Sequence, residues 1–280
     1  WWERMGVWLF LLGAVALVVL LIPGIGRNVN GATRWIPLGP LNLQPSELMK
    51  LFAVIYVSGY LVRHADAVAN QLGGFVKPMI LVGIAAALIL KQPDFGTTAV
   101  MLATVMGLLF LGGASLMPFA VIFGAVLTGL SFLVLTSEYR MKRVLSFLDP
   151  FQDPFASGYQ LSQALIGFGR WEWRGVGLGN GIQKQYFLPE AHTEFIASVV
   201  GEELGLAGML ATIAAFTFIA WRAFSIGSRA EAAGQRFAAY AAQGLGLWLG
   251  LQAFVNIGVN VGMLPTKGLT LPFMSYGSNS

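Results

Sequence analysis

Residues 97–136 read TTAVMLATVMGLLFLGGASLMPFAVIFGAVLTGLSFLVLT and contain no acidic or basic residue. Two apolar segments in this stretch, 97–112 and 116–136, are separated only by the short connection 113–115. A helix needs about 20 mostly apolar residues to cross the hydrocarbon core of a bilayer. The stretch therefore predicts two membrane-spanning helices joined by a tight turn.

The composition of the whole chain points to the same class of protein. Of its 280 residues, 11% are charged and 56% are hydrophobic, and the mean hydropathy is +0.69. Soluble domains contain about 25% charged residues, and a larger core cannot explain the deficit because a core still needs a polar shell. We therefore predict an all-α polytopic membrane protein. The 35 glycines fit this class, since small residues let membrane helices approach closely.

Cysteine and histidine usage limits the chemistry. The chain has no Cys, which excludes disulfides and thiolate metal sites. Its two histidines, His64 and His192, are far apart in the sequence, so a zinc site made only of protein ligands is not expected. The net charge of +4 gives no indication of nucleic-acid binding.

Hydropathy divides the chain into seven candidate spans, at about residues 5–22, 46–62, 78–90, 97–112, 116–136, 204–224 and 237–258. The third is short, so it must begin in the preceding polar stretch, or be re-entrant, to fit a bilayer. We predict a single transmembrane domain over residues 1–280, a multi-helix bundle with one large extracytoplasmic loop at 137–193. Basic residues in the short loops only weakly favour a cytoplasmic position for the side opposite that loop.

The large loop is more than a passive linker, because residues 138–203 hold eight of the 13 acidic residues. Residues 159–168, YQLSQALIGF, are amphipathic and predict a short helix in the membrane interface. Glycines then alternate at positions 175, 177, 179 and 181 and predict a turn-rich loop. Their spacing is not GxGxxG and no strand precedes them, so they do not indicate a dinucleotide site.

Charged residues at the ends of apolar spans are costly and therefore candidates for function. Glu47 and Lys50 lie three apart on one helical face, which fits a structural ion pair and a functional site equally well. Arg34, beside Trp35, could bind a lipid phosphate, and the alternative is that it snorkels to ordinary headgroups. Asp94 precedes the fourth span and is better explained as a helix cap.

The strongest group of polar residues ends the large loop. In LPEAHTEFI, residues 188–196, the residues Glu190, His192 and Glu194 alternate. An extended segment would place all three on one face, whereas a helix would pair the two acids. A carboxylate at the membrane boundary can serve as a general base, and the alternative is a first-turn acid favoured by the helix dipole.

Further polar residues lie just before the sixth span, in the seventh span and after it. For Glu202 and Glu203 we expect at least one pairing with an arginine. Asn256 and Asn260 belong to the same set. Lys267 lies in LPTKGLTLP, residues 264–272, a rigid non-helical loop. Such a loop at membrane depth must line a cavity or pack in protein, so Lys267 either faces an anionic ligand or snorkels to the surface.

Five motifs in order along the chain resemble the SEDS family of bacterial shape, elongation, division and sporulation proteins. They are NGATRWI (30–36), QPSELMKL (44–51), QPDFGT (92–97), LPEAHTEF (188–195) and LPTKGLTLP (264–272). The last motif is more similar to the family's division branch than to its elongation branch. Because family members have about ten spans, the resemblance implies that this chain lacks roughly the first two helices and the last.

The resemblance implies a peptidoglycan glycosyltransferase that polymerises lipid II, a disaccharide-pentapeptide on undecaprenyl pyrophosphate. A lipid II flippase and a scaffold for division proteins are the alternatives. The implied place is the bacterial inner membrane at the division septum, with the large loop in the periplasm. The implied partners are a class B penicillin-binding protein, which is a transpeptidase, and other division proteins. No cofactor is implied with certainty, and a divalent cation at the pyrophosphate stays open.

The same resemblance assigns roles to residues. Glu194 occupies the position of the family's essential acid, which is usually Asp, and its carboxylate here reaches one methylene further. It would act as the base or position the acceptor sugar. The cations expected to stabilise the pyrophosphate are Arg34, Lys50 and Lys267. Glu47 is expected to orient Lys50, and His192 is a further residue expected to bind the substrate.

Overall fold

The computed structural model describes residues 2–29, 32–38, 41–152, 158–169, 173–266 and 268–276. Each of the seven predicted spans corresponds to a helix: α1 (Trp2–Val19), α2 (Pro45–Asn70), α3 (Leu72–Lys91), α4 (Phe95–Leu111), α5 (Leu116–Leu135), α8 (Ile196–Ala232) and α9 (Arg236–Asn260). Within the described part of the chain, five of them are long and apolar enough to cross a membrane: α1, α2, α3, α5 and α8. The prediction of an all-α membrane fold is confirmed.

The third predicted span shows how the sequence underestimates a helix. Helix α3 begins at Leu72 and continues through Pro78, so it reaches 20 residues and a length sufficient to cross. Its first two turns contain two glycines and Lys77, which lower the mean hydropathy there, so the helix start was missed. In a bilayer every backbone N–H and C=O must be paired within the segment, which favours extending the helix over leaving a loop.

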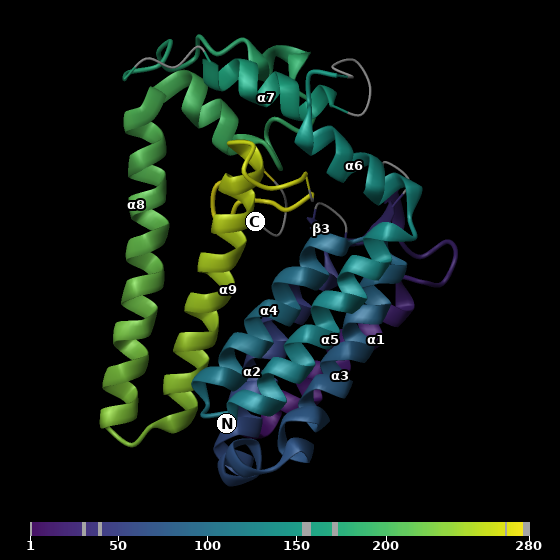
Figure 1. Ribbon diagram of the computed structural model, residues 1–280, viewed down its shortest axis with the longest axis vertical. Helices are drawn as coiled ribbons and strands as arrows, with labels where there is room; N and C mark the ends of the chain where they lie inside the picture. The colour runs from purple at the N-terminus through teal and green to yellow at the C-terminus, as the bar shows by residue number, and fades with distance from the viewer. Residues whose placement is uncertain are drawn as a thin grey trace. The chain divides into compact units, whose positions relative to one another are not determined.

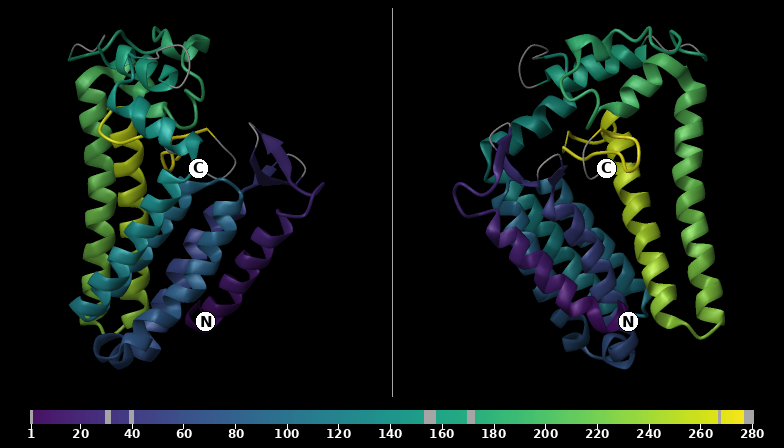
Figure 2. Two further views of the ribbon diagram at one scale, coloured as in Figure 1. Left: turned by 45° about the vertical axis from the view of Figure 1, so that its right-hand side comes forward. Right: turned by 180° about the vertical axis from the view of Figure 1, so that it is seen from behind.

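The chain divides into two compact units, and each is described by itself. The first contains residues up to 127 together with 219–248. Helices α1 to α4 lie side by side in it (Figure 1, Figure 2), and apolar side chains such as Phe10, Val57, Phe75 and Leu108 form its core.

In the same unit, the end of α8 and the start of α9 are joined by a short turn (Figure 2). A Cβ on Gly246 would lie 2.9 Å from the Cβ of Ala223, so only glycine permits this approach.

A small antiparallel sheet connects α1 to α2, where the sequence predicted only a loop. Its strands are β1 (Arg27–Val29), β2 (Ala32–Leu38) and β3 (Leu41–Leu43), in the order β1-β2-β3. Ile36 of β2 pairs with Leu43 of β3. Strand β2 carries Arg34, so the sheet fixes the position of a predicted site residue.

The second unit contains the described residues of 128–218 and 249–276. Its loop region carries α6 (Glu138–Leu148), α7 (Tyr159–Gly169) and the single-turn π-helix η1 (Gln183–Phe187). Helix α7 confirms the short helix predicted at 159–168, whereas α6 was not predicted. Helix α8 is broken at Gly205, which has a φ of +65°, just where the sixth apolar span begins.

The core of the second unit lies under the loop segment that carries Glu194. Phe195 and Leu188 are buried together with Ala164 of α7 and Val259 of α9. Leu271, after α9, is buried against Phe216 and Ala253. Apolar residues on either side of the polar motif therefore anchor it, and its polar side chains are left for other contacts.

Candidate functional site

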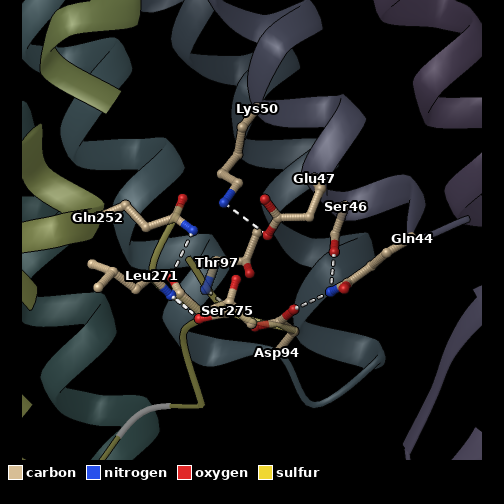
Figure 3. A network of polar contacts seen from close by, with 10 residues as sticks. Gln44, Ser46, Glu47, Lys50, Asp94, Thr97, Gln252, Leu271 and Ser275 are labelled. Carbon is tan, nitrogen blue, oxygen red and sulfur yellow. Dashed lines mark hydrogen bonds and ion pairs between the residues drawn. The ribbon is translucent and has the colours of Figure 1, made fainter. Parts of the chain in front are cut away.

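The first unit contains a buried ion pair on α2. Lys50 Nζ lies 2.8 Å from Glu47 Oε1, and the side chain of Lys50 is only 1% exposed. The Lys50 ammonium also lies 5.2 Å from the ring centroid of Trp248 on α9, within cation–π range. The pair predicted from the i,i+3 spacing is present (Figure 3), and a buried cation of this kind is a costly feature that needs a reason.

The start of α4 is organised around Asp94. Its Oδ1 accepts a hydrogen bond from the main-chain N–H of Thr97 at 3.1 Å, which confirms the predicted helix cap. Its Oδ2 lies 3.5 Å from Gln44 Nε2, and this amide also donates to Ser46 Oγ at 3.0 Å (Figure 3). Asp94 thus links the beginnings of α2 and α4.

Arg34 is directed at the turn between α3 and α4. Its Nε donates to the carbonyl of Gln92 at 3.2 Å, and an Nη donates to that of Pro93 at 2.8 Å. The guanidinium therefore holds the small sheet against this turn, a role that the sequence did not indicate. Whether it also contacts a phosphate stays a prediction.

In the second unit, residues 188–195 form a series of turns that lead into α8. The main-chain N–H groups of Thr193 and Phe195 both donate to the carbonyl of Glu190 at 3.1 Å. The Thr193 hydroxyl donates to Glu190 Oε2 at 2.6 Å, and Glu190 has a left-handed φ of +58°. The segment is neither the extended strand nor the regular helix considered from the sequence. As a result Glu190 stabilises the turn, His192 is exposed and Glu194 is half-buried.

Two asparagines of α9 hold the main chain of Glu194. Asn256 Nδ2 donates to the Glu194 carbonyl at 2.9 Å, and Asn260 Nδ2 donates to the same oxygen at 3.0 Å. Asn256 Nδ2 also donates to the carbonyl of Leu269 at 2.6 Å. One pair of amides therefore ties the Glu194 segment both to α9 and to the loop that follows it.

That loop, residues 268–276, supports the Glu194 segment from its other end. The N–H of Tyr276 donates to the carbonyl of His192, and the hydroxyl of Ser275 donates to that of Thr193, each at 2.6 Å. Ser275 Oγ in turn accepts from the N–H of Leu271 (Figure 3). Gly268 lies against Glu194, since a Cβ there would be 3.1 Å from Glu194 Oε1.

Glu202 and Glu203 are clamped by the loop of alternating glycines, which we call the glycine arch (residues 175–183). Four main-chain N–H groups donate to the two carboxylates at 3.0–3.3 Å: those of Gly179, Gly181, Ile182 and Gln183. Lys184 Nζ lies 2.5 Å from Glu203 Oε1. The cation found on Glu203 is a lysine, where the sequence led us to expect an arginine. The arch supplies the hydrogen-bond donors without which burial of these carboxylates would be costly.

The structure thus places most of the predicted site residues, though in separate groups. Glu47 and Lys50 form a pair in the first unit, where Arg34 has its own contacts, while His192 and Glu194 share one turn segment in the second. Lys267 lies outside the described residues. No three or more His, Cys, Asp or Glu gather into a metal-binding group in the ranges that the structure describes.

Sequence reasoning assigned no role to the residues that hold Glu194 in place. Asn256 and Asn260 were visible as polar residues in an apolar span, a signal that usually marks function in membranes. Their targets are main-chain carbonyls, which no sequence pattern reveals. The support from Ser275 could not be found from sequence at all, since a serine in a polar loop is unremarkable by composition.

These features define a class: a multi-pass helical membrane protein with a buried charged pair on one span and a conformationally fixed carboxylate segment at the start of another. The chain belongs to the FtsW, RodA and SpoVE family of cell cycle proteins, whose model matches residues 1–280. The family resemblance of the five motifs is confirmed.

Individual relatives agree with this membership. The chain is 74% identical to the probable peptidoglycan glycosyltransferase FtsW of Allochromatium vinosum, with 100% of this chain and 70% of that protein covered. It is 56% identical to the protein of the same name from Methylococcus capsulatus, with 99% of this chain and 70% of that protein covered.

Solved structures agree as well. One from a study titled "Structural coordination of polymerization and crosslinking by a peptidoglycan synthase complex" matches with a TM-score of 0.77 at 28% identity, covering 99% of this chain and 76% of that one. The rod shape determining protein RodA of Thermus thermophilus matches with a TM-score of 0.68 at 26% identity, covering 99% and 73%.

Proposed function

We propose that this chain is a peptidoglycan glycosyltransferase that polymerises lipid II into glycan strands for septal wall synthesis in cell division. Its membership of the cell cycle protein family supports this, as does 74% identity to a probable peptidoglycan glycosyltransferase. The structural observation that carries the proposal is the Glu194 segment. Its main chain is fixed by Asn256, Asn260 and Ser275, while its carboxylate stays only half-buried, as a group that must meet a substrate requires.

Glu194 is proposed as the general base. In the polymerisation step an acceptor sugar hydroxyl gives its proton to the Glu194 carboxylate, and its oxygen forms a bond to the anomeric carbon of the donor. The bond from that carbon to the pyrophosphate oxygen breaks, and the undecaprenyl pyrophosphate leaves with the electron pair. Proton transfer of this kind contributes about 10²–10⁴ in rate.

The leaving pyrophosphate needs cations. We assign this role to Arg34, Lys50 and Lys267, with Glu47 holding the Lys50 ammonium in place at 2.8 Å. His192, exposed beside Glu194, is proposed to contact the sugar or peptide part of the substrate. A divalent cation at the pyrophosphate is compatible with this assignment and is not required by it.

The cellular setting is proposed on the same basis. The chain is a multi-pass membrane protein; we place it in the bacterial inner membrane at the septum, as a single transmembrane domain with the 137–193 loop in the periplasm. A class B penicillin-binding protein is proposed as its transpeptidase partner, together with other division proteins. A solved structure that it resembles comes from a peptidoglycan synthase complex, which fits such a partnership.

The test is polymerisation of purified lipid II by the full-length protein with its transpeptidase partner. Glu194→Gln is expected to lower glycan synthesis by more than about 100-fold while lipid II binding stays within about threefold. Glu194→Asp is expected to retain synthesis. The matched control is Glu190→Gln, the same change four residues earlier on a carboxylate that contacts Thr193.

Unchanged synthesis by Glu194→Gln would move the chemistry to another acid and reject the assignment. If no form makes glycan but the parent moves lipid II across vesicle membranes, the chain is a flippase. If loss of Glu194, Lys50 and Lys267 is tolerated alike in dividing cells, the chain is a scaffold.

A further inference from the structure

We propose that Asn256 and Asn260 are positioning residues that set the direction of the Glu194 carboxylate, with Ser198 fixing the orientation of Asn260. This inference rests on the proposed role of Glu194 as base. It adds three side chains to that site, none of which has to touch the substrate.

The first step of the argument is burial. Asn256, Asn260 and Ser198 are 1%, 0% and 0% exposed, so each polar atom must find its partner within the protein. Asn256 and Asn260 stand four residues apart on the last turn of α9 and therefore project from one face of the helix. Because water does not reach these two amides, their presence in an apolar helix must be explained by their contacts within the protein.

The second step is that the orientation of both amides is fixed by their neighbours. Asn260 Oδ1 accepts from the main-chain N–H of Ser198 at 3.0 Å and from its hydroxyl at 2.7 Å. Because a main-chain N–H can only donate, the Asn260 oxygen must face it, which leaves the NH₂ group for the Glu194 carbonyl. Asn256 Nδ2 likewise faces two carbonyls, those of Glu194 and Leu269, which can only accept.

The third step is the convergence of both donors on one atom. The Glu194 carbonyl accepts from Asn256 at 2.9 Å and from Asn260 at 3.0 Å, so both of its lone pairs are used. Two bonds from one helix fix the peptide plane that follows the Glu194 Cα, and the bond from Ser275 Oγ holds the Thr193 carbonyl in the plane before it. With both planes held, the Cα–Cβ direction of Glu194 is fixed. A displacement of about 1 Å at a reacting group can cost about 100-fold in rate.

The experiment measures lipid II polymerisation by the full-length protein with its transpeptidase partner for Asn256→Ala and Ser198→Ala. Asn256→Ala removes a direct bond to the Glu194 carbonyl and is expected to lower kcat at least tenfold. Ser198→Ala removes one of the two donors to Asn260 Oδ1, the hydroxyl, and keeps the main-chain N–H, so it is expected to lower kcat only about threefold. KM for lipid II is expected to stay within twofold for both, because the binding groups are untouched.

The matched control is Thr212→Val on α8, whose buried hydroxyl donates to the carbonyl of Gly208 in its own helix. It is expected to leave kcat unchanged. The folded fraction of every variant is measured by size-exclusion chromatography and thermal unfolding, and kcat is expressed per folded molecule. Ser198→Ala is small enough to fold even if Asn256→Ala does not.

A coupling measurement separates positioning from general support. If Asn256 acts through Glu194, the factor by which Asn256→Ala lowers kcat will differ at least threefold between the parent and a Glu194→Asp background. The same factor in both backgrounds, or an unchanged kcat in folded Ser198→Ala and Asn256→Ala, overturns the inference. If Glu194→Asp is inactive, the kcat of Ser198→Ala decides alone. A parent protein that makes no glycan rejects the proposed function instead.

Discussion

Two regions of this protein bury charge in opposite ways. On α2, Lys50 is paired with a carboxylate one turn away and lies near the face of Trp248. On α8, two adjacent carboxylates, Glu202 and Glu203, are surrounded chiefly by main-chain N–H groups of the glycine arch. The first site is built from side chains of opposite charge, and the second is built from a folded loop.

The difference has an energetic consequence. A buried ion pair can be replaced as a unit, because removing both charges also removes both desolvation penalties. A carboxylate held by main-chain N–H groups cannot be replaced in this way, since the donors remain when the acid is gone and stay buried without partners. The ion pair is therefore the more replaceable of the two sites, which fits its proposed role toward a charged substrate, whereas the acids held by the loop stabilise the fold.

The largest effect is expected at the clamped acids. Glu203→Ala deletes the acceptor of two main-chain N–H groups and the partner of Lys184, and we expect it to lower the free energy of unfolding by roughly 4 kcal/mol. Adding Lys184→Met is not expected to restore stability. The measurement is unfolding in mixed detergent micelles, followed by fluorescence of the eight tryptophans. Recovery of most of the lost stability in the double variant would show that the site is an ordinary ion pair.

A slightly smaller effect is expected at the α2 pair. Glu47→Met leaves Lys50 buried beside Trp248 without its carboxylate, at an expected cost of about 3 kcal/mol. Here the double variant Glu47→Met with Lys50→Met is expected to regain at least half of the loss in the same unfolding assay. It is not expected to regain glycan synthesis, because the ammonium is proposed to meet the pyrophosphate. Recovery of synthesis along with stability would remove Lys50 from the site.

The smallest effect is expected in the glycine arch, where two glycines distinguish the cost of backbone strain from the cost of a steric clash. Gly175 and Gly179 both have left-handed φ angles, of +66° and +87°. A Cβ at Gly175 would lie 2.5 Å from the main chain of Glu203, whereas a Cβ at Gly179 would meet nothing within 4 Å. We expect Gly175→Ala to destabilise the protein by about 1–3 kcal/mol more than Gly179→Ala. Equal losses would mean that the arch does not pack against α8 as closely as described.

Local features of this protein were predictable from its sequence. Each span was visible as an apolar run, the Glu47–Lys50 pair followed from helical spacing, and Asp94 was recognisable as a cap. Helix α7 followed from its amphipathic pattern. All of these depend on residues within a turn or two of one another, so periodicity alone contains the information.

Features that join distant segments were not predictable. Asn256 and Asn260 are separated from Glu194 by more than 60 residues, as their hydrogen bonds to it show. The β1–β3 sheet and the contacts of Arg34 with the α3–α4 turn also escaped the sequence analysis. In each case the partners include main-chain groups, which are chemically the same at every position and leave no mark in the residue pattern.

The sequence by itself therefore determined the class of protein, the helices and the acid to consider first. Hydrophobicity and helical periodicity decide the class and the helices, because a bilayer allows few ways to satisfy a backbone. The choice of acid came from the resemblance of the motifs to a known family. Only the tertiary structure decided that the glycines at 175–181 serve Glu202 and Glu203, and that Glu194 is held through its carbonyl. Those assignments depend on which donors and acceptors lie near one another in space, because a buried polar group must find its hydrogen-bond partner within the protein.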